Sequence, residues 1–295
     1  MKISLDQPEK MRILITSDVH YSDHKLWYGV SSADRVQLWV NAIREENCRE
    51  RLDGIIFAGD ASLDHYLMQG SYTSEGISST DLFVKKYVSQ LPKGIPILLG
   101  PGNHELYSNE QWKGYTGQNR QGSVVIGDQL FILLDTFCTA LEPNFDGQLA
   151  RYTPVDVSYV KKQMQRYPGT RVWLVAHYFD AANETPEFRK LVREESRITA
   201  LFAGHSHQSS VVSLNAEYGN KVIAQTGNFS YSYFTPFPSG NQQDLLDSFW
   251  GFRDLVITNR GAESHYILAK NNLARVNGQP LCMERHEVHT VKFQF

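Results

Sequence analysis

The chain has 295 residues, of which 41% are hydrophobic and 21% are charged. This balance is ordinary for a globular enzyme, excludes disordered and fibrous proteins, and leaves room for one large α/β domain or two small ones. Basic and acidic residues number 29 and 32, so the net charge of −3 predicts no strong footprint for nucleic acid.

The sequence predicts a cytoplasmic protein. Residues 1–10 are too polar for a signal peptide, and no apolar run reaches the length of about 18 residues that a membrane-spanning helix needs. Cys48, Cys138 and Cys282 lie far apart and show no CxxC spacing. We therefore expect neither a disulfide framework nor a zinc–thiolate site.

Strands and helices are predicted to alternate through the first two thirds of the chain. Short apolar runs indicate buried strands, and runs with one charged side indicate helices. The predicted strands are residues 12–16, 53–58, 95–100, 124–126, 130–134, 171–176 and 200–203. The predicted helices are residues 33–52, 82–91, 154–167 and 186–195.

The last third of the chain is rich in predicted strands. They are residues 210–214, 221–225, 252–257, 264–268 and 288–293. Early βαβ units followed by a run of strands predict an α/β fold of two packed sheets with helices outside. Since we find no internal repeat and no long linker, we expect a single domain over residues 1–295. A part over about residues 11–230 would carry the motifs, and a β-rich part over 231–295 would pack on it.

Five short polar motifs come directly after apolar runs. They are Asp18-Val19-His20, Gly59-Asp60, Gly102-Asn103-His104-Glu105, His177, and Gly204-His205-Ser206-His207. Ligand crevices of open α/β sheets form at the carboxyl ends of the strands. We therefore expect these five motifs to meet at one rim of the fold.

The residue types of these motifs suit metal ions. Imidazole together with carboxylate favours Fe, Mn, Zn or Co over Ca and Mg, which prefer oxygen ligands. In an extended chain, the spacing of two would place Asp18 and His20 on one side, and likewise His205 and His207. Seven ligands exceed the needs of one ion but suit two ions about 3.5–4 Å apart, provided that one carboxylate bridges them. Glycines before Asp60, Asn103 and His205 would permit close approach of the backbone.

In this order, DxH, GD, GNHE, an isolated His after a strand, and GHxH resemble the signature of the calcineurin-like metallophosphoesterase superfamily. The motifs extend from Asp18 to His207, about two thirds of the chain. The resemblance implies a four-layer α/β/β/α sandwich of two mixed sheets flanked by helices. It also implies two transition-metal ions, with Mn or Fe favoured and Zn, Co or Ni possible.

The same resemblance implies roles for the motif residues. A first ion would be held by Asp18, His20, Asp60 and His207. A second ion would be held by Asp60, Asn103, His177 and His205, so that Asp60 bridges the two. His104 would bind no metal and would act near the leaving group, either as a general acid or by stabilising charge on the phosphoryl oxygens.

The implied activity is hydrolysis of a phosphoester by a metal-activated hydroxide. Residues 59–65 lack the arginine of the GDxxDRG motif of the superfamily's Ser/Thr phosphatases, and Leu63 replaces the tyrosine ligand of purple acid phosphatases. A phosphodiester of a small molecule or nucleotide is therefore the favoured substrate, without a membrane partner. A phosphomonoesterase, a nuclease, and a non-catalytic binding module like the superfamily's retromer subunit stay open. The sequence does not fix the oligomeric state.

Other polar residues near the motifs have weaker signals. Asp64 could orient His104, because carboxylates often orient catalytic imidazoles. Glu105 is expected to be structural or to support a ligand. His24 and His65 lie in loops, where they could contact substrate, although solvated loop histidines are commoner.

Two features of the C-terminal third are also open. His286 and His289 have the spacing of one face of an element and no partner motif, so a surface position is favoured. An aromatic segment follows residue 228 and could either stack on a flat group of the substrate or pack across a sheet edge. Its members are Phe229, Tyr231, Tyr233, Phe234, Phe237, Phe249 and Trp250.

Overall fold

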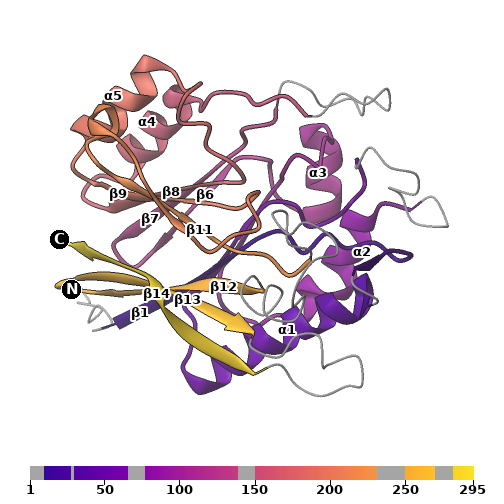
Figure 1. Ribbon diagram of the computed structural model, residues 1–295. Coiled ribbons are helices and arrows are strands. Elements are labelled where there is room, and N and C mark those ends of the chain that lie inside the picture. Colours follow the sequence, from indigo (N-terminus) through magenta and orange to yellow (C-terminus); the bar gives the residue numbers. More distant parts are fainter. Residues whose placement is uncertain (1–9, 28–29, 66–76, 139–149, 231–249, 270–281) are drawn as a thin grey trace, which may run out of the picture.

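The computed structural model describes residues 10–27, 30–65, 77–138, 150–230, 250–269 and 282–295. This part of the chain forms two mixed six-stranded sheets with five α-helices, which confirms the predicted α/β class (Figure 1). A short two-stranded sheet joins β2 (Leu26–Trp27) to β3 (Val30–Ser31). In the aromatic segment, only Phe229, Ser230 and Trp250 lie within the described residues.

The first sheet has the strand order β14-β13-β12-β1-β4-β5. Its parallel strands are β1 (Lys10–Thr16), β4 (Gly54–Ala58) and β5 (Ile97–Gly100). Its antiparallel strands are β12 (Gly251–Thr258), β13 (Gly261–Ala269) and β14 (Met283–Gln294), and β12 pairs directly with β1. The C-terminal strands thus extend the sheet that carries the first three motifs.

The second sheet has the strand order β10-β11-β9-β8-β7-β6. Its four central strands are parallel: β7 (Gln129–Leu134), β8 (Arg171–Ala176), β9 (Ile198–Ala203) and β11 (Val222–Gln225). Antiparallel strands β6 (Gly122–Ile126) and β10 (Val211–Ser213) form its edges. The last two motifs follow β8 and β9, at the centre of this sheet.

Each helix begins at a side chain that accepts a hydrogen bond from its first turn, which satisfies an otherwise free backbone donor. The helices are α1 (Ser32–Arg49), α2 (Ser79–Lys86), α3 (Asn109–Thr116), α4 (Val157–Arg166) and α5 (Pro186–Glu194). Ser108 forms a complete capping box with Gln111 at the start of α3. Pro186 occupies the first turn of α5, where its missing N–H costs nothing.

Three apolar layers separate the four structural layers. Along β1, Leu14 packs toward α1, while Ile13 and Ile15 enter the core between the two sheets. A third core lies between the second sheet and helices α4 and α5. Figure 1 shows these helices on one outer side and α1 on the other. Trp173, fully buried between the sheets, would cost about 3–5 kcal/mol of stability if truncated to alanine.

Several predicted boundaries differ from those observed. The helix expected over residues 82–91 is α2 followed by the 3₁₀ turn η1 (Val88–Gln90). Helix α3 was not predicted, because its polar sequence buries only Trp112. Strand β14 begins at Met283, before the predicted start.

The remaining sequence predictions have mixed outcomes. Cys48, Cys138 and Cys282 form no disulfide with one another. Among the described residues, no helix is long and apolar enough to cross a membrane. The cytoplasmic location and the division into domains stay predictions.

Candidate metal centre

All five motifs lie where a parallel strand ends. Asp18 follows β1, Asp60 follows β4 and Asn103 follows β5 in the first sheet. His177 follows β8 and His205 follows β9 in the second sheet. The prediction that the motifs lie at carboxyl ends of strands is therefore confirmed. The motif residues of the two sheets lie close together.

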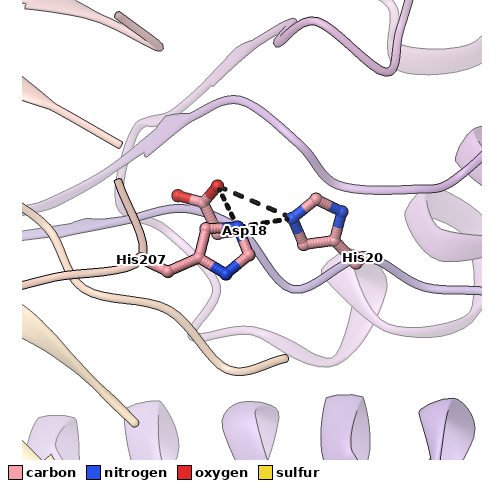
Figure 2. A group of neighbouring side chains, drawn as sticks. All are labelled: Asp18, His20 and His207. Atoms are coloured by element: carbon pink, nitrogen blue, oxygen red, sulfur yellow. Dashed lines mark hydrogen bonds and ion pairs between the residues drawn. The ribbon is translucent and has the colours of Figure 1, made fainter. Parts of the chain in front are cut away.

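The first group of donor atoms comprises Asp18, His20 and His207, all buried (Figure 2). Oδ1 of Asp18 lies 3.3 Å from Nε2 of His207 and 3.6 Å from Nε2 of His20. The two ring nitrogens are 3.1 Å apart. Figure 2 shows the carboxylate and both rings turned toward one another, although His207 comes from the opposite sheet.

The second group comprises Asp60, Asn103, His177 and His205. Oδ1 of Asn103 lies 2.9 Å from Nε2 of His177 and 2.9 Å from Nδ1 of His205. The two ring nitrogens are 3.3 Å apart, and Oδ2 of Asp60 lies 3.1 Å from Nε2 of His177. One carboxylate, one amide oxygen and two imidazoles therefore converge.

The carboxylate of Asp60 stands between the two groups. Its Oδ2 atom lies 3.6 Å from Nε2 of His20 in the first group and 3.1 Å from Nε2 of His177 in the second. Its Oδ1 atom accepts a hydrogen bond from the backbone N–H of His104, at 3.1 Å. Asp60 is thus placed to serve both groups through a single oxygen.

The backbone of the motifs is left-handed. Six residues other than glycine have positive φ in the described part of the chain, and five of them are Asp18, His20, Asp60, His205 and His207. Such a conformation costs about 1–3 kcal/mol per residue and persists only where surrounding contacts hold it. The backbone strain is therefore concentrated at residues whose side chains supply donor atoms.

The prediction of an extended chain at the DxH and GHxH motifs is wrong. Asp18 and His20 reach the same group through left-handed turns, with φ of 55° and 46°. His205 and His207 do not share a side, since His205 joins the second group and His207 the first. Tight turns after each strand, rather than alternation along it, decide where these side chains point.

Glycines permit the close contacts around the groups, as predicted. Gly59 has φ of 93°, and a side chain there would lie 2.7 Å from Nδ1 of His177. A side chain at Gly102 would overlap Oδ1 and the backbone nitrogen of Asp60. Both positions require glycine because the backbone itself packs against a donor residue.

Hydrogen bonds outside the groups fix the donor atoms. Oδ2 of Asp18 accepts from Oγ of Ser17 and, at 3.0 Å, from the backbone N–H of His205. Nδ1 of His177 donates to the carbonyl oxygen of Ala58, at 2.9 Å, which turns Nε2 toward the second group. Buried Glu105 accepts from the backbone N–H of Asp60 at 3.0 Å, a structural role as expected.

Burial and charge together set the protonation of the groups. Burial alone would raise the pKa of Asp18 and Asp60, but neighbouring histidines hold both well below their ordinary value. Burial lowers the pKa of His104 to about 3 and that of His205 to about 4. Burial would also lower the pKa of His177, yet Asp60 and Asp18 raise it to about 9. Metal ions bind ionised carboxylates and neutral rings, so the carboxylates are in the binding form and the ring of His177 must lose a proton when an ion binds.

The residues present fit transition-metal ions. Oδ1 of Asp18 is buried and accepts no hydrogen bond from the described residues. Buried polar atoms normally have a partner, so this oxygen is suited to a cation. Donor atoms bound at about 2.0–2.2 Å to one ion lie roughly 3–3.5 Å from each other, which matches the spacings within both groups. Imidazole, carboxylate and amide donors suit Mn, Fe, Co, Ni or Zn.

His104 lies beside both groups. Its Nε2 atom is 3.7 Å from Oδ2 of Asp60, and its ring centroid is 5.1 Å from that of His20. Its side chain is 12% exposed, whereas the side chains of His20 and His177 are fully buried. His104 is therefore accessible from solvent at the edge of the cluster.

Other sequence candidates have structural positions instead. Asp64 was proposed to orient His104. Its carboxylate instead accepts hydrogen bonds from the backbone N–H groups of Ser79 and Thr80 and so stabilises the start of α2, and this prediction is wrong. His65 is buried against Tyr107 and is neither solvated nor a donor of either group.

The remaining candidates fall away from the two groups. His24 pairs with Asp23 at 2.6 Å. His289 is half-buried and hydrogen-bonded to Ser209, so its predicted surface position is wrong. Phe229 and Trp250 stack in the core beside α1, and the other aromatic residues of their segment lie outside the described part.

Some residues around the groups had no sequence signal. Phe137 packs against the rings of His177 and His205, with centroids 5.9 Å and 6.3 Å apart, and Tyr178 lies 4.8 Å from His205. Buried Arg120 holds the GNHE turn through the carbonyl of Glu105, at 2.5 Å. An isolated aromatic or arginine forms no motif, so only the folded chain identifies these contacts.

A four-layer sandwich whose strand ends carry two donor groups that share a carboxylate has the architecture of a metallophosphoesterase. Residues 11–209 match the family model described as calcineurin-like phosphoesterase, and the chain belongs to this family. No curated protein sequence matches the chain.

Two solved structures share the fold at low identity, and a third matches at lower structural similarity. The structure of PhoD matches with a TM-score of 0.61 and 8% identity, over 97% of this chain and 70% of that one. GAP50, described as the anchor in the inner membrane complex of Plasmodium, matches with a TM-score of 0.50 and 12% identity, over 94% and 88%. Vacuolar protein sorting 29 from Cryptosporidium parvum matches with a TM-score of 0.43 and 11% identity, over 97% and 99%.

Proposed function

We propose that this chain is a dinuclear metal-dependent phosphoesterase that hydrolyses a phosphodiester of a small molecule or nucleotide. The observation that carries the proposal is the position of Asp60, whose Oδ2 atom faces both donor groups. A shared carboxylate between two sets of imidazoles is the arrangement that two-metal hydrolysis requires. Membership in a family of phosphoesterases supports the same reaction.

Two ions would be held by residues from both sheets. Asp18, His20, His207 and Asp60 would hold the first, and Asp60, Asn103, His177 and His205 would hold the second. When bound, the ions would supply Lewis acidity toward the phosphoryl group and would lower the pKa of a bound water enough to make hydroxide available at neutral pH.

The protein's own residues would orient the reaction. The hydrogen bond from Nδ1 of His177 to Ala58 keeps Nε2 directed inward. Asp60 balances positive charge at the centre of the site. His104, whose side chain is largely buried but reaches solvent at the edge of the cluster, is placed to donate a hydrogen bond or a proton on the leaving-group side of a phosphoester.

The diester preference follows from the charge of the substrate. A phosphomonoester carries a second negative charge that arginine side chains often bind through paired hydrogen bonds. The arginine that follows the GD motif in protein phosphatases is absent from residues 59–65. A singly charged diester needs no such side chain.

The test is turnover by protein loaded with Mn²⁺. We expect a higher kcat/KM for bis(p-nitrophenyl) phosphate than for p-nitrophenyl phosphate. A wider panel of esters, including nucleotide diesters, is then assayed in the same way. A higher value for the monoester would refute the diester preference. Protein with two bound ions that cleaves neither ester nor any member of the panel would refute the enzyme and leave the binding-module alternative.

A further inference from the structure

The turn that carries His205 and His207 is held by strands outside the region that matches the family. The match ends at residue 209, between this turn and β10. The contacts to residues 207–210, at the end of the turn, come from the end of β11, from β12 and from β14, which all lie later in the chain.

Arg253 of β12 connects several of these segments. Its Nε atom donates to the carbonyl of Gln225 at 2.8 Å, and Nη1 donates to the carbonyl of His289 at 2.5 Å. Its Nη2 atom donates to the carbonyls of Ser209 and, at 3.3 Å, Ser210. One guanidinium thus joins β11, β14 and the turn after His207.

This arginine is unusual because it is fully buried and meets carbonyl oxygens instead of carboxylates. Among the described residues, Arg253 forms no ion pair, whereas buried Arg12 in the neighbouring strand pairs with Asp254 at 3.0 Å. Burial lowers the pKa of Arg253 only to about 10, so the side chain stays charged at neutral pH. The desolvation cost of this buried cation is offset by charge-assisted hydrogen bonds to carbonyl oxygens instead of by an opposite charge.

The bonds of Arg253 complete a network that fixes both ligands. Asn228 donates from Nδ2 to the carbonyl of His207 at 2.9 Å, and the backbone N–H of Gly227 donates to Gln208 at 2.8 Å. Ser209 also pairs through Oγ with Nδ1 of His289, at 2.5 Å. His205 and His207 are both left-handed, so the turn depends on these outside contacts to keep its strained shape.

We propose that Arg253 is a positioning residue for the metal centre, acting through the turn that holds one ligand of each ion. The inference rests on the metal centre of the proposed function. Without the guanidinium, the carbonyls of Gln225, Ser209 and His289 lose this donor, while Ser210 keeps the backbone N–H of Gln225. The turn can then relax away from the two ligand positions. Loss of such an outer contact typically weakens metal binding by about 10–100-fold.

The experiment measures Mn²⁺ binding to metal-free full-length protein, by electron paramagnetic resonance of the free ion. Arg253→Met removes the charge and the donors, and Arg253→Lys keeps the charge but loses the planar set of donors. Arg12→Lys is the matched control, because Arg12 is a buried arginine of the same sheet that does not contact the turn. Thermal unfolding of each metal-free variant reports stability separately.

We expect Mn²⁺ affinity to fall by about 10–100-fold in Arg253→Met and by less in Arg253→Lys, while Arg12→Lys keeps wild-type affinity. Turnover of Arg253→Met should recover at saturating Mn²⁺. Wild-type affinity in the Arg253 variants, or an equal loss in Arg12→Lys, would overturn the proposal. If the methionine variant does not fold, the two lysine variants decide. Wild-type protein that binds two ions but cleaves no ester would refute the proposed function alone.

Discussion

The Nε2 atoms of His20 and His207 lie 3.1 Å apart, although 187 positions separate the two residues in sequence. One ring follows the first strand of the first sheet, and the other follows a central strand of the second. The carboxylate of Asp18 lies against both rings. The first donor group is therefore produced by the packing of the two sheets and not by either sheet alone.

The first prediction concerns metal content. Purified protein loaded with Mn²⁺ or Fe²⁺ should contain two ions per chain, because each donor group offers enough ligands for one ion. Elemental analysis with protein quantified by amino-acid analysis gives the ratio. A ratio that never exceeds one ion would contradict the dinuclear arrangement.

Asp60→Asn should weaken both ions at once. The amide carries no negative charge and has only one oxygen, so it cannot replace the carboxylate whose Oδ2 faces His20 and His177. Removal of an outer contact typically lowers metal affinity by about 10–100-fold, and we expect a larger loss of metal affinity for Asp60→Asn. Turnover should be absent at limiting metal. Asp64→Asn is the matched control, since Asp64 is a buried carboxylate of the same loop that accepts hydrogen bonds from Ser79, Thr80 and Tyr107 and belongs to neither donor group. Near-normal activity of Asp60→Asn at limiting metal would show that Asp60 is not a metal ligand and serves only in the turn.

His104→Ala should keep both ions and lose about 10²–10⁴-fold in kcat, the usual contribution of general acid catalysis. If His104 protonates the leaving group, the loss should be largest for alkyl or nucleoside alcohols and small for p-nitrophenol. If the ring stabilises charge on phosphoryl oxygens, the loss should be similar for all leaving groups. A series of esters with graded leaving-group pKa measures the difference.

Metal analysis of the same samples provides the control for His104. Retention of two ions assigns the loss to chemistry at the substrate. Disappearance of one ion would make His104 a ligand, which the group formed by His20, Asp60 and His104 would also allow geometrically.

The pH dependence of stability should depend on His65. Burial lowers the pKa of this ring from its ordinary 6.5 to about 4, and its Nδ1 atom accepts from the backbone N–H of Leu106 at 2.8 Å. Between these two pH values the unfolded chain binds the proton and the folded chain does not. The contribution of His65 is therefore complete above pH 6.5 and is lost as the pH falls toward 4, by at most about 3 kcal/mol.

Asparagine at position 65 retains an acceptor near Nδ1 and cannot be protonated. Urea unfolding of chelator-treated protein from pH 4 to 7 should show a shallower loss of stability in His65→Asn than in wild type. Equal slopes for the two proteins would show that the folded protein binds the His65 proton as readily as the unfolded chain does.

The fold could be predicted from the sequence because buried strands such as β1 and β8 are short, continuous apolar runs. Their carboxyl ends located the motifs without tertiary information. Helix α3 could not be found in this way, because its stability comes from a capping box and one buried tryptophan instead of an apolar face.

The site was predictable in composition but not in local geometry. Spacing suggested that His205 and His207 share one side, and left-handed turns at both residues send them to different groups. Likewise Asp64 has a residue type suited to orienting a histidine, yet its carboxylate accepts hydrogen bonds from the start of α2 and from the hydroxyl of Tyr107. Backbone handedness and long-range partners such as Arg253 are consequences of packing that a linear pattern does not contain.

The division of the donors between two sheets has a consequence for how the chain comes apart. The two sheets are joined by an apolar core and by a few hydrogen bonds, such as those from Arg253 to the carbonyls of Gln225 and Ser209. Local separation of such layers is observed as hydrogen exchange. A cation bound by Asp18 of one sheet and His207 of the other would be released by the same opening. Ion binding would therefore suppress exchange in β1 and β9 together, and the two halves of the sandwich would unfold as a single cooperative unit.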